Sequence, residues 1–554
     1  MTLVGAVACG GAGGQPGGRP DDTGTGGTGG TSTGAGGTAD AGNIPDAGSD
    51  AGTDAGTDAG TDAGTPDAGT DGGVITVVPP SLGPDWSFFT AADGLPADVR
   101  GVSADESGNI WVAGGSAGLF LQRGGQGSFQ QFGLADGLHP YGYLNGDMAK
   151  FMGVPDGSPA DPSPSLAATP VISVAGGPAN TVFVGYQGKN GCEGAWKWQC
   201  AVSHCVKTDA KGNCTQSVCD QATSPSTWGD PAVYKSGDAD KVTLSGAGIS
   251  VAHYDIFSGP NVVGNEQGGR ERLCSVFRIV YQHGTNFLWF GANHGFAFGK
   301  ADFAGNPGCD GQIPCAGVWE HVHPAFNDSA GNLVTGDYWG IAIDPLSQGG
   351  FHDVWFGGMA RTTRFRFGET GGDYFAAQPM TEKSTSANVN SDPAALAAWH
   401  NRFDVWPDAV GEYDAAGNPT APTPAQWNAG LDVVSGIAAD PADDSAWVAS
   451  FAHGVRHLDH DGHPLGDLTK ASGALFADNV SAIAIDTDGS LWVGYKFVGG
   501  ISRIHKDGTV EHFASVLGAS LANSPVLDIQ ITPTTPRKVL VAFQNGAVAV
   551  YRGN

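Results

Sequence analysis

A short unit recurs along this chain and constrains its fold more than any other feature. Its clearest copy starts with a turn at Asp105 and Gly108, continues as the apolar run Ile110-Trp111-Val112, and reaches a second glycine turn before Leu119. Asp/Gly turns between short aromatic-centred runs are typical of antiparallel strands. The unit therefore predicts a hairpin built around one tryptophan.

Seven runs have this character, and each is centred on one large apolar residue. The centres are Trp111, Phe183, Trp289, Trp355, Trp447, Trp492 and Leu540. Such self-similarity is typical of repeat architectures. A small sheet that is apolar on both faces is not stable alone, and radial stacking buries both faces. We therefore expect an all-β chain folded as a β-propeller, with seven blades favoured over six or eight.

The best copies also resemble a known repeat. The copies that start at Asp93-Gly94-Leu95-Pro96 and at Val480 are similar to the two-component-regulator propeller repeat. This resemblance implies a propeller, and some relatives are periplasmic sensors that recognise polysaccharide fragments. It covers the propeller only, so a signalling role is not carried over.

The ring needs a closing strand. Trp86-Ser87-Phe88-Phe89 precedes the first unit and can supply an outer strand to the blade around Leu540. Closure of this kind removes exposed sheet edges. We expect the domain to span residues 79–554.

The chain begins with a different composition. Residues 1–9 end in Ala6-Val7-Ala8-Cys9, which resembles the lipobox of a bacterial lipoprotein signal, with Cys9 as the lipidated residue; the alternative is an incidental cysteine. Residues 10–78 are rich in Gly, Thr, Asp and Ala and lack the apolar side chains that a core needs. We expect a disordered linker between a lipid anchor and the propeller, in the bacterial cell envelope, or a secreted protein.

Charge excludes one class of partner. The chain has 56 acidic and 27 basic residues, a net charge of −29. Nucleic-acid binders need a basic face, so a nucleic-acid partner is not expected. A membrane is expected only through the lipid anchor.

Four segments exceed what seven blades need, and we interpret them as insertions at about 139–165, 188–271, 303–332 and 369–432. They contain or flank eight cysteines: Cys192, Cys200, Cys205, Cys214, Cys219, Cys274, Cys309 and Cys315. An even count in an exported protein favours disulfides, with a zinc site as the weaker alternative. Eight cysteines allow 105 pairings, so the connectivity stays open.

Candidate ligand residues lie in the loops between second and third strands. His294, Arg361, His453 and Lys496 would meet around the channel mouth and suit a carboxylate, sulfate or sugar. The alternative is a solvated rim whose residues lie too far apart to cooperate.

Histidines raise the question of a metal. They are His321 and His323, and the group His453, His457, His460 and His463. Their positions on turns and strands do not require convergence, so we expect no metal and no cofactor.

No sequence motif of a catalytic elbow, a metalloprotease helix or a phosphate-binding loop is found. The sequence favours a module that binds a glycan or protein ligand over an enzyme. The alternative is a propeller lyase or hydrolase that acts on glycans or lactones, with acidic or histidine side chains clustered at the channel mouth.

Overall fold

The structure is a computed structural model of the chain. It describes residues 83–140, 143–144, 155, 158–159, 164–188, 200–208, 211, 214–222, 239–254, 275–284, 286–292, 295–301, 320–322, 326–327, 333–334, 338–344, 353–358, 361–365, 403–406 and 433–553. Contacts divide the chain into Met1–Ala39 and Asp40–Asn554, and every described residue belongs to the second unit. Cys9, the lipobox-like run before it and the predicted linker therefore lie outside the described residues.

The described residues form seven four-stranded antiparallel sheets, each a blade with its strands in sequence order except where noted. Blade one has β2 (Gly101–Ala104), β3 (Ile110–Ala113), β4 (Leu119–Gln122) and β5 (Gln130–Phe132). Blade two has β8 (Val171–Gly176), β9 (Thr181–Tyr186), β12 (Ala239–Ser245) and β13 (Gly248–Tyr254). Blade three has β14 (Val276–Gln282), β15 (Phe287–Ala292), β16 (Gly295–Lys300) and β17 (Glu320–Val322).

The remaining blades repeat the pattern. Blade four has β20 (Tyr338–Ile343), β21 (Val354–Gly358), β22 (Arg361–Phe365) and β23 (Phe403–Trp406). Blade five has β24 (Val434–Ala439), β25 (Ala446–Ser450), β26 (Gly454–Leu458) and β27 (Pro464–Leu468). Blade six has β28 (Val480–Ile485), β29 (Leu491–Tyr495), β30 (Ile501–Ile504) and β31 (Val510–His512).

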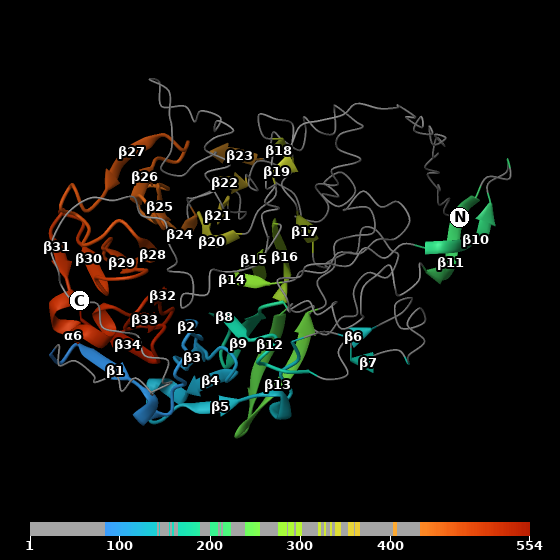
Figure 1. Ribbon diagram of the computed structural model, residues 1–554, viewed down its shortest axis with the longest axis horizontal. Coiled ribbons are helices and arrows are strands. Elements are labelled where there is room, and N and C mark those ends of the chain that lie inside the picture. The colour runs from blue at the N-terminus through green and yellow to red at the C-terminus, as the bar shows by residue number, and fades with distance from the viewer. Residues whose placement is uncertain are drawn as a thin grey trace, which may run out of the picture. The chain divides into compact units, whose positions relative to one another are not determined.

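Blade seven joins the two ends of the described chain. It consists of β32 (Val526–Ile531), β33 (Val539–Phe543), β34 (Ala547–Tyr551) and, as its outer strand, β1 (Trp86–Phe89). Trp86 pairs with Tyr551 and Phe89 with Val548, so the predicted closing strand is confirmed (Figure 1). The first strands also contact one another in cyclic order, from β2 through β8, β14, β20, β24, β28 and β32 back to β2. The chain is therefore a β-propeller, as the sequence predicts.

The repeated tryptophans lie on the second strand of their blades. Trp111 and Trp492 are fully buried, and each indole N–H donates to the aspartate of the preceding turn: Trp111 Nε1 to Asp105 Oδ2 at 3.0 Å, and Trp492 Nε1 to Asp486 Oδ2 at 3.2 Å. Asp105 also accepts the N–H groups of residues 107 and 109 in its own turn. One aspartate therefore fixes both the turn and the aromatic wedge. Burial raises the pKa of Asp105, and the hydrogen bonds from Asn109 and Trp111 oppose that rise.

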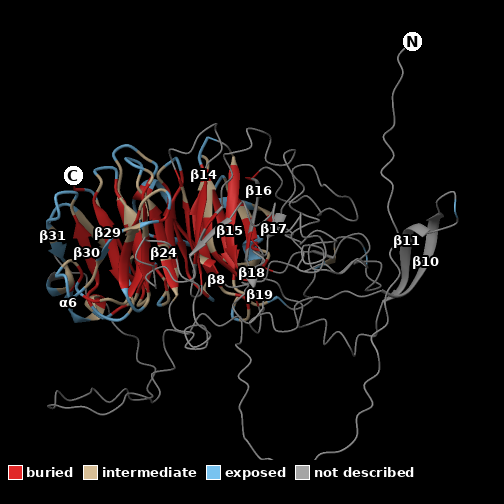
Figure 2. Ribbon diagram, turned by 90° about the horizontal axis from the view of Figure 1, so that it is seen from above, coloured by how far each residue is buried: buried red, intermediate tan, exposed pale blue. Residues whose placement is uncertain are grey.

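The glycine that follows the aromatic run has a packing role. A Cβ at Gly494 would lie 2.3 Å from Val526 Cγ1, and one at Gly357 would lie 2.2 Å from Val434 Cγ1. Both valines start the first strand of the next blade. The glycine therefore lets adjacent blades approach closely, and the packed strands are buried, as Figure 2 shows for β24 and β29.

Three predicted insertions contain blade strands and are corrected accordingly. The range 188–271 includes β12 and β13, the range 303–332 includes β17, and the range 369–432 includes β23. None of these third and fourth strands carries the aromatic run followed by glycine or alanine that marks the second strands. The extra chain of blade two lies between β9 and β12 instead.

Short elements complete the described residues. Three two-stranded sheets pair β6 (Tyr143–Leu144) with β7 (Ser158–Pro159), β10 (Cys200–Thr208) with β11 (Cys214–Ala222), and β18 (Phe326–Asn327) with β19 (Leu333–Val334). The helical elements are η1 (Ala91–Asp93), η2 (Arg123–Gly125), η3 (Leu134–Asp136) and α6 (Ala514–Ala522). In the described part of the chain, no helix has the length and apolar character needed to cross a bilayer.

Candidate ligand site at the channel mouth

The first strands share an irregularity close to their starts. In six of the seven described first strands, one extra residue interrupts the pairing with the second strand. The extra residues are Ile172, Phe277, Trp339, Ser435, Ser481 and Leu527. In blade one, Arg100 occupies the matching place, directly before Gly101, and its N–H donates to Ala113 O. A β-bulge redirects the side chain of the extra residue.

These seven residues lie together. All of them line one cavity of about 300 Å³, along with neighbours from the first strands and from the loops after the second strands. Those loops supply Phe451, Lys496 and Gln544. Every blade therefore contributes to the cavity, and it lies where the starts of the first strands meet: the mouth of the central channel.

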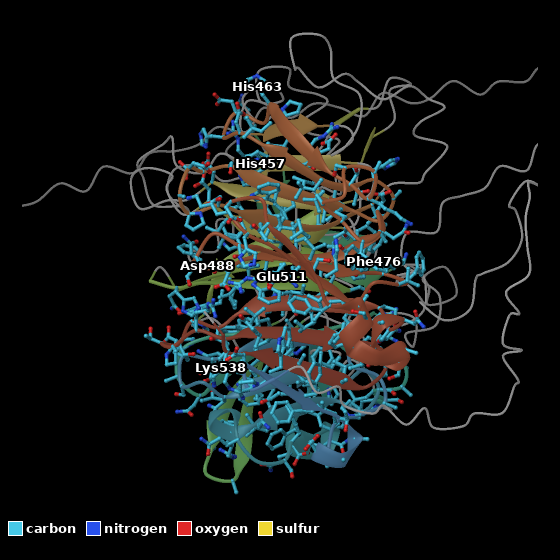
Figure 3. All side chains as sticks on the ribbon, turned by 90° about the vertical axis from the view of Figure 1, so that its left-hand side faces the viewer. His457, His463, Phe476, Asp488, Glu511 and Lys538 are labelled. Atoms are coloured by element: carbon cyan, nitrogen blue, oxygen red, sulfur yellow. The ribbon has the colours of Figure 1, made fainter. Side chains whose placement is uncertain are left out.

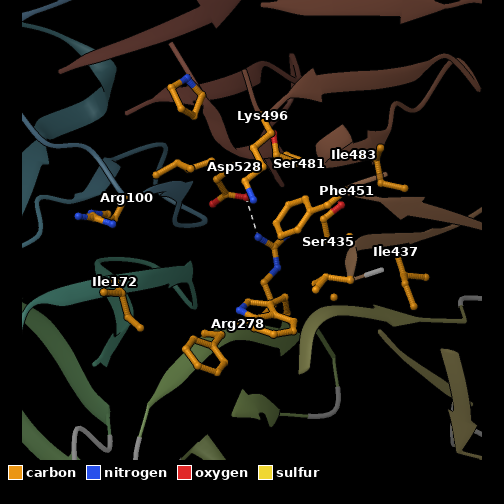
Figure 4. Close-up of a pocket in the computed structure, with 18 of the residues that line it drawn as sticks. Arg100, Ile172, Arg278, Ser435, Ile437, Phe451, Ser481, Ile483, Lys496 and Asp528 are labelled. Atoms are coloured by element: carbon orange, nitrogen blue, oxygen red, sulfur yellow. Dashed lines mark hydrogen bonds and ion pairs between the residues drawn. The ribbon is translucent and has the colours of Figure 1, made fainter. Parts of the chain in front are cut away.

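One ion pair spans the channel. Arg278 of β14 donates from Nη1 to Asp528 Oδ1 of β32 at 2.6 Å, so it joins blade three to blade seven (Figure 4). Asp528 is almost fully buried, and its other oxygen accepts the Val102 N–H at 3.2 Å. Gln530 Nε2 also donates to Asp528 Oδ1. The only carboxylate among the described residues that line the cavity is therefore held by three donors.

Lys496 has different surroundings. Its Nζ lies 4.0 Å from the ring centre of Phe451 and 5.3 Å from that of Phe497. No described carboxylate forms an ion pair with it. Burial lowers the pKa of Lys496, because a half-buried ammonium loses hydration. Cation–π contact offsets part of that loss but leaves the ammonium able to hold an anion.

The rest of the lining is mixed. Arg100 Nε bonds to Asp98 Oδ2 at 2.8 Å, and Asp98 also lines a shallower hollow that shares Lys496 and Gln544 with the cavity. The rings of Phe277 and Trp339 stack with centres 5.4 Å apart. Aromatic faces beside cations suit a ligand with a flat or apolar body and a negative group.

Serine hydroxyls at this level join neighbouring blades. Ser435 Oγ donates to Val480 O at 2.7 Å, and Ser481 Oγ donates to Val526 O at 2.6 Å. Ser173, one residue after the bulge of its strand, donates to Val276 O at 2.6 Å. These hydroxyls are engaged in the ring itself, so we assign them a structural role.

The four residues predicted to contact a ligand differ in where the structure places them. Lys496 lines the cavity, whereas His453 is not among the lining residues, and its N–H donates to Ser450 Oγ. His294 and the side chain of Arg361 lie outside the described residues. The sequence analysis missed Arg100, Arg278 and Asp528. Aligning the first strands on their shared pattern, an apolar residue, two variable residues and then Val or Ile, would have found them.

The clustered histidines do not converge on one point. His457 stacks on Trp447 with ring centres 3.8 Å apart, and its Nε2 lies 2.8 Å from Ser445 Oγ. Burial lowers the pKa of His457. His463 pairs with Asp459. Figure 3 shows the side chains of His457 and His463 well separated.

Four of the eight cysteines predicted to form disulfides lie among the described residues. Cys200 and Cys205 lie on β10, and Cys214 and Cys219 lie on the paired strand β11. Cys192, Cys274, Cys309 and Cys315 lie outside the described residues. The disulfides stay a prediction.

Among the comparisons with known proteins, only those with solved structures find similar chains. No protein-family model matches this chain, and no curated protein matches its sequence. Among solved structures it is similar to a streptogramin B lyase, with 11% identity, a TM-score of 0.38, and coverage of 84% of this chain and 97% of that one. It is also similar to YCF48 bound to D1 peptide, with 12% identity, a TM-score of 0.41, and coverage of 86% and 98%. At such scores the matches carry no argument about ligand or chemistry, and the assignment as a propeller rests on the sheets described above.

Proposed function

We propose that this propeller is a binding module whose channel mouth holds an acidic saccharide. The observation that carries the proposal is Lys496: a half-buried cation on two aromatic rings, with no carboxylate partner among the described residues, beside a cavity built by all blades. A buried positive charge of this kind is stabilised by an anionic ligand.

The ligand class follows from the lining. Phe277, Trp339 and Phe451 offer flat apolar surface to a sugar ring, and Lys496 and Arg100 offer donors to a uronate or sulfate group. The cavity of about 300 Å³ is at the lower end for small-ligand sites and fits one or two sugar rings.

The lining favours binding over catalysis. A propeller lyase or hydrolase needs an acid or base that can exchange protons with its substrate. Among the described lining residues, no histidine is present, and the single carboxylate, Asp528, is held by Arg278, Gln530 and the Val102 N–H.

Calorimetric titration of the whole chain with a uronate oligosaccharide and with a neutral oligosaccharide of equal length tests this function. We expect binding of the acidic sugar only, and a loss of about 10- to 100-fold in affinity for Lys496→Gln, the cost of one charged hydrogen bond. Lys506→Gln is the matched control, because Lys506 is exposed on a loop at the other end of its blade. Equal binding of both sugars, or of a peptide in place of the acidic sugar, would overturn the assignment.

We further propose that the module is held in the bacterial cell envelope by a lipid on Cys9, with residues 10–78 as a spacer. The lipobox-like run Ala6-Val7-Ala8-Cys9 and the glycine- and aspartate-rich composition after it support this proposal. Metabolic labelling with a radioactive fatty acid should mark the wild-type protein and leave Cys9→Ser unmarked. Equal labelling of both proteins would contradict it.

A further inference from the structure

One histidine of the predicted group has unexpected neighbours. His460, in the turn between β26 and β27, lies beside Asp344, which follows β20, and Asp444, in the turn between β24 and β25. One ligand atom of each residue lies within 4.8 Å of the others, and His460 Nδ1 is 3.5 Å from Asp344 Oδ2. The three residues come from blades four and five, at the end of the strands opposite to the channel mouth.

The hydrogen bonding around this group is incomplete. Asp444 Oδ1 and His460 Nδ1 are buried atoms for which the described residues provide no hydrogen-bond partner. Buried polar atoms almost always have one, so such a pair calls for a partner that protein atoms do not supply. Asp344 has no exposed surface. A cation between the three residues would meet both atoms and neutralise buried negative charge.

The surrounding charge also suits a cation. The loops of blade five at this end carry Asp440, Asp443 and Asp459. Arg364 also lies at this end: its Nη1 donates to the carbonyl oxygen of His460, and its guanidinium lies over the Trp355 ring, 5.5 Å from its centre. Arg364 therefore binds the main chain of the histidine turn and stacks on an indole.

We propose that Asp344, Asp444 and His460 form a site for one divalent transition-metal ion that joins blade four to blade five. One imidazole nitrogen with two carboxylates is a donor set that suits Mn²⁺ or Zn²⁺, whereas Ca²⁺ and Mg²⁺ prefer oxygen alone. Three protein ligands leave further positions for water. The site is separate from the channel mouth, so the metal proposal does not depend on the saccharide proposal and is tested independently of it.

Mn²⁺ binding to the whole chain, followed by electron paramagnetic resonance after removal of metals with a chelator, tests the site. Mn²⁺ is the probe of choice because thiolates bind it poorly, so the nine cysteines of the chain do not compete. We expect one equivalent to bind to the wild type. Asp444→Asn and His460→Gln should each weaken it by at least about tenfold, as is usual when a metal site is disturbed.

The matched controls are Asp461→Asn and His463→Gln, which change the same residue types in the turn that also contains His460. Both control variants should bind Mn²⁺ as the wild type does. Circular dichroism of the metal-free variants checks folding. If His460→Gln does not fold, Mn²⁺ binding by the near-isosteric variant Asp444→Asn tests the site instead. No stoichiometric Mn²⁺ binding by the wild type, or equal losses in site and control variants, would overturn the proposal.

Discussion

The two ends of the first strands differ in what they conserve from blade to blade. At the turn end, the Asp105 carboxylate accepts the Trp111 indole N–H and the Asp486 carboxylate accepts the Trp492 indole N–H, so blades one and six share this contact. At the mouth end, the equivalent bulge position carries arginine, isoleucine, phenylalanine, tryptophan, serine, serine and leucine in turn. The repeated end makes the fold, and the varied end makes the site.

This difference has a physical reason. The turn end contacts only its own blade and a neighbour of the same kind, so the same contact can recur, as it does in blades one and six. The mouth end faces the axis, where seven positions with six kinds of side chain line one cavity, and identical residues would give a ring without specificity. The residues of the proposed ligand site are therefore those at which the repeat varies.

The largest expected effect lies at the turn end. Trp492→Ala should lower the free energy of unfolding by about 3–5 kcal/mol, because it empties a fully buried volume and leaves Asp486 without the indole donor. Trp447→Ala should cost clearly less, since Trp447 is only partly buried. Urea titration measures both. Equal losses of unfolding free energy for the two variants would show that the burial of the tryptophan does not set its contribution to stability.

The channel ion pair should come next. Arg278→Gln leaves the buried Asp528 carboxylate without its charged partner and should cost about 1–3 kcal/mol, less than a fully buried pair because Arg278 is partly exposed. The double variant Arg278→Gln/Asp528→Asn should recover at least half of the loss in the same urea titration. A double variant that is as unstable as the sum of both single variants would show that the pair has no coupling.

A smaller effect is expected for the hydroxyl between blades six and seven. Ser481→Ala removes the hydrogen bond to Val526 O and should cost about 1 kcal/mol. Ser116→Ala, at an exposed position, serves as the control and should leave the unfolding midpoint unchanged. A neutral result for Ser481→Ala would remove the structural role that we assign to the mouth serines.

The smallest effect concerns affinity alone. Because burial lowers the pKa of Lys496 from its ordinary value of 10.5, its charge is lost at a lower pH than that of an exposed lysine. The protonated form attracts an anion, so affinity for a uronate oligosaccharide should fall as the pH rises from 7 towards 10, and Lys496→Gln should show a flatter profile. Calorimetry at several pH values measures this affinity. Identical pH profiles for the wild type and Lys496→Gln would show that Lys496 does not contact the ligand.

Sequence reasoning located the second strands well and the outer strands poorly. The anchors from Trp111 to Leu540 and the closing strand Trp86–Phe89 were predictable, because an aromatic wedge and its tight turn depend on neighbours within one hairpin. The strands β12 and β13 were assigned to an insertion, because an outer strand has a weaker apolar pattern and here follows a long interruption.

The sequence by itself determined that this chain builds repeated hairpins around aromatic residues and that its ends can close a ring. Only the tertiary structure brought Arg278 to Asp528, Lys496 to Phe451, and His460 to Asp344 and Asp444. These contacts join different blades, and their geometry depends on where bulges turn each strand and how many blades close the ring. Periodicity records the local requirements of a hairpin, whereas contacts across the axis leave no regular spacing in the sequence.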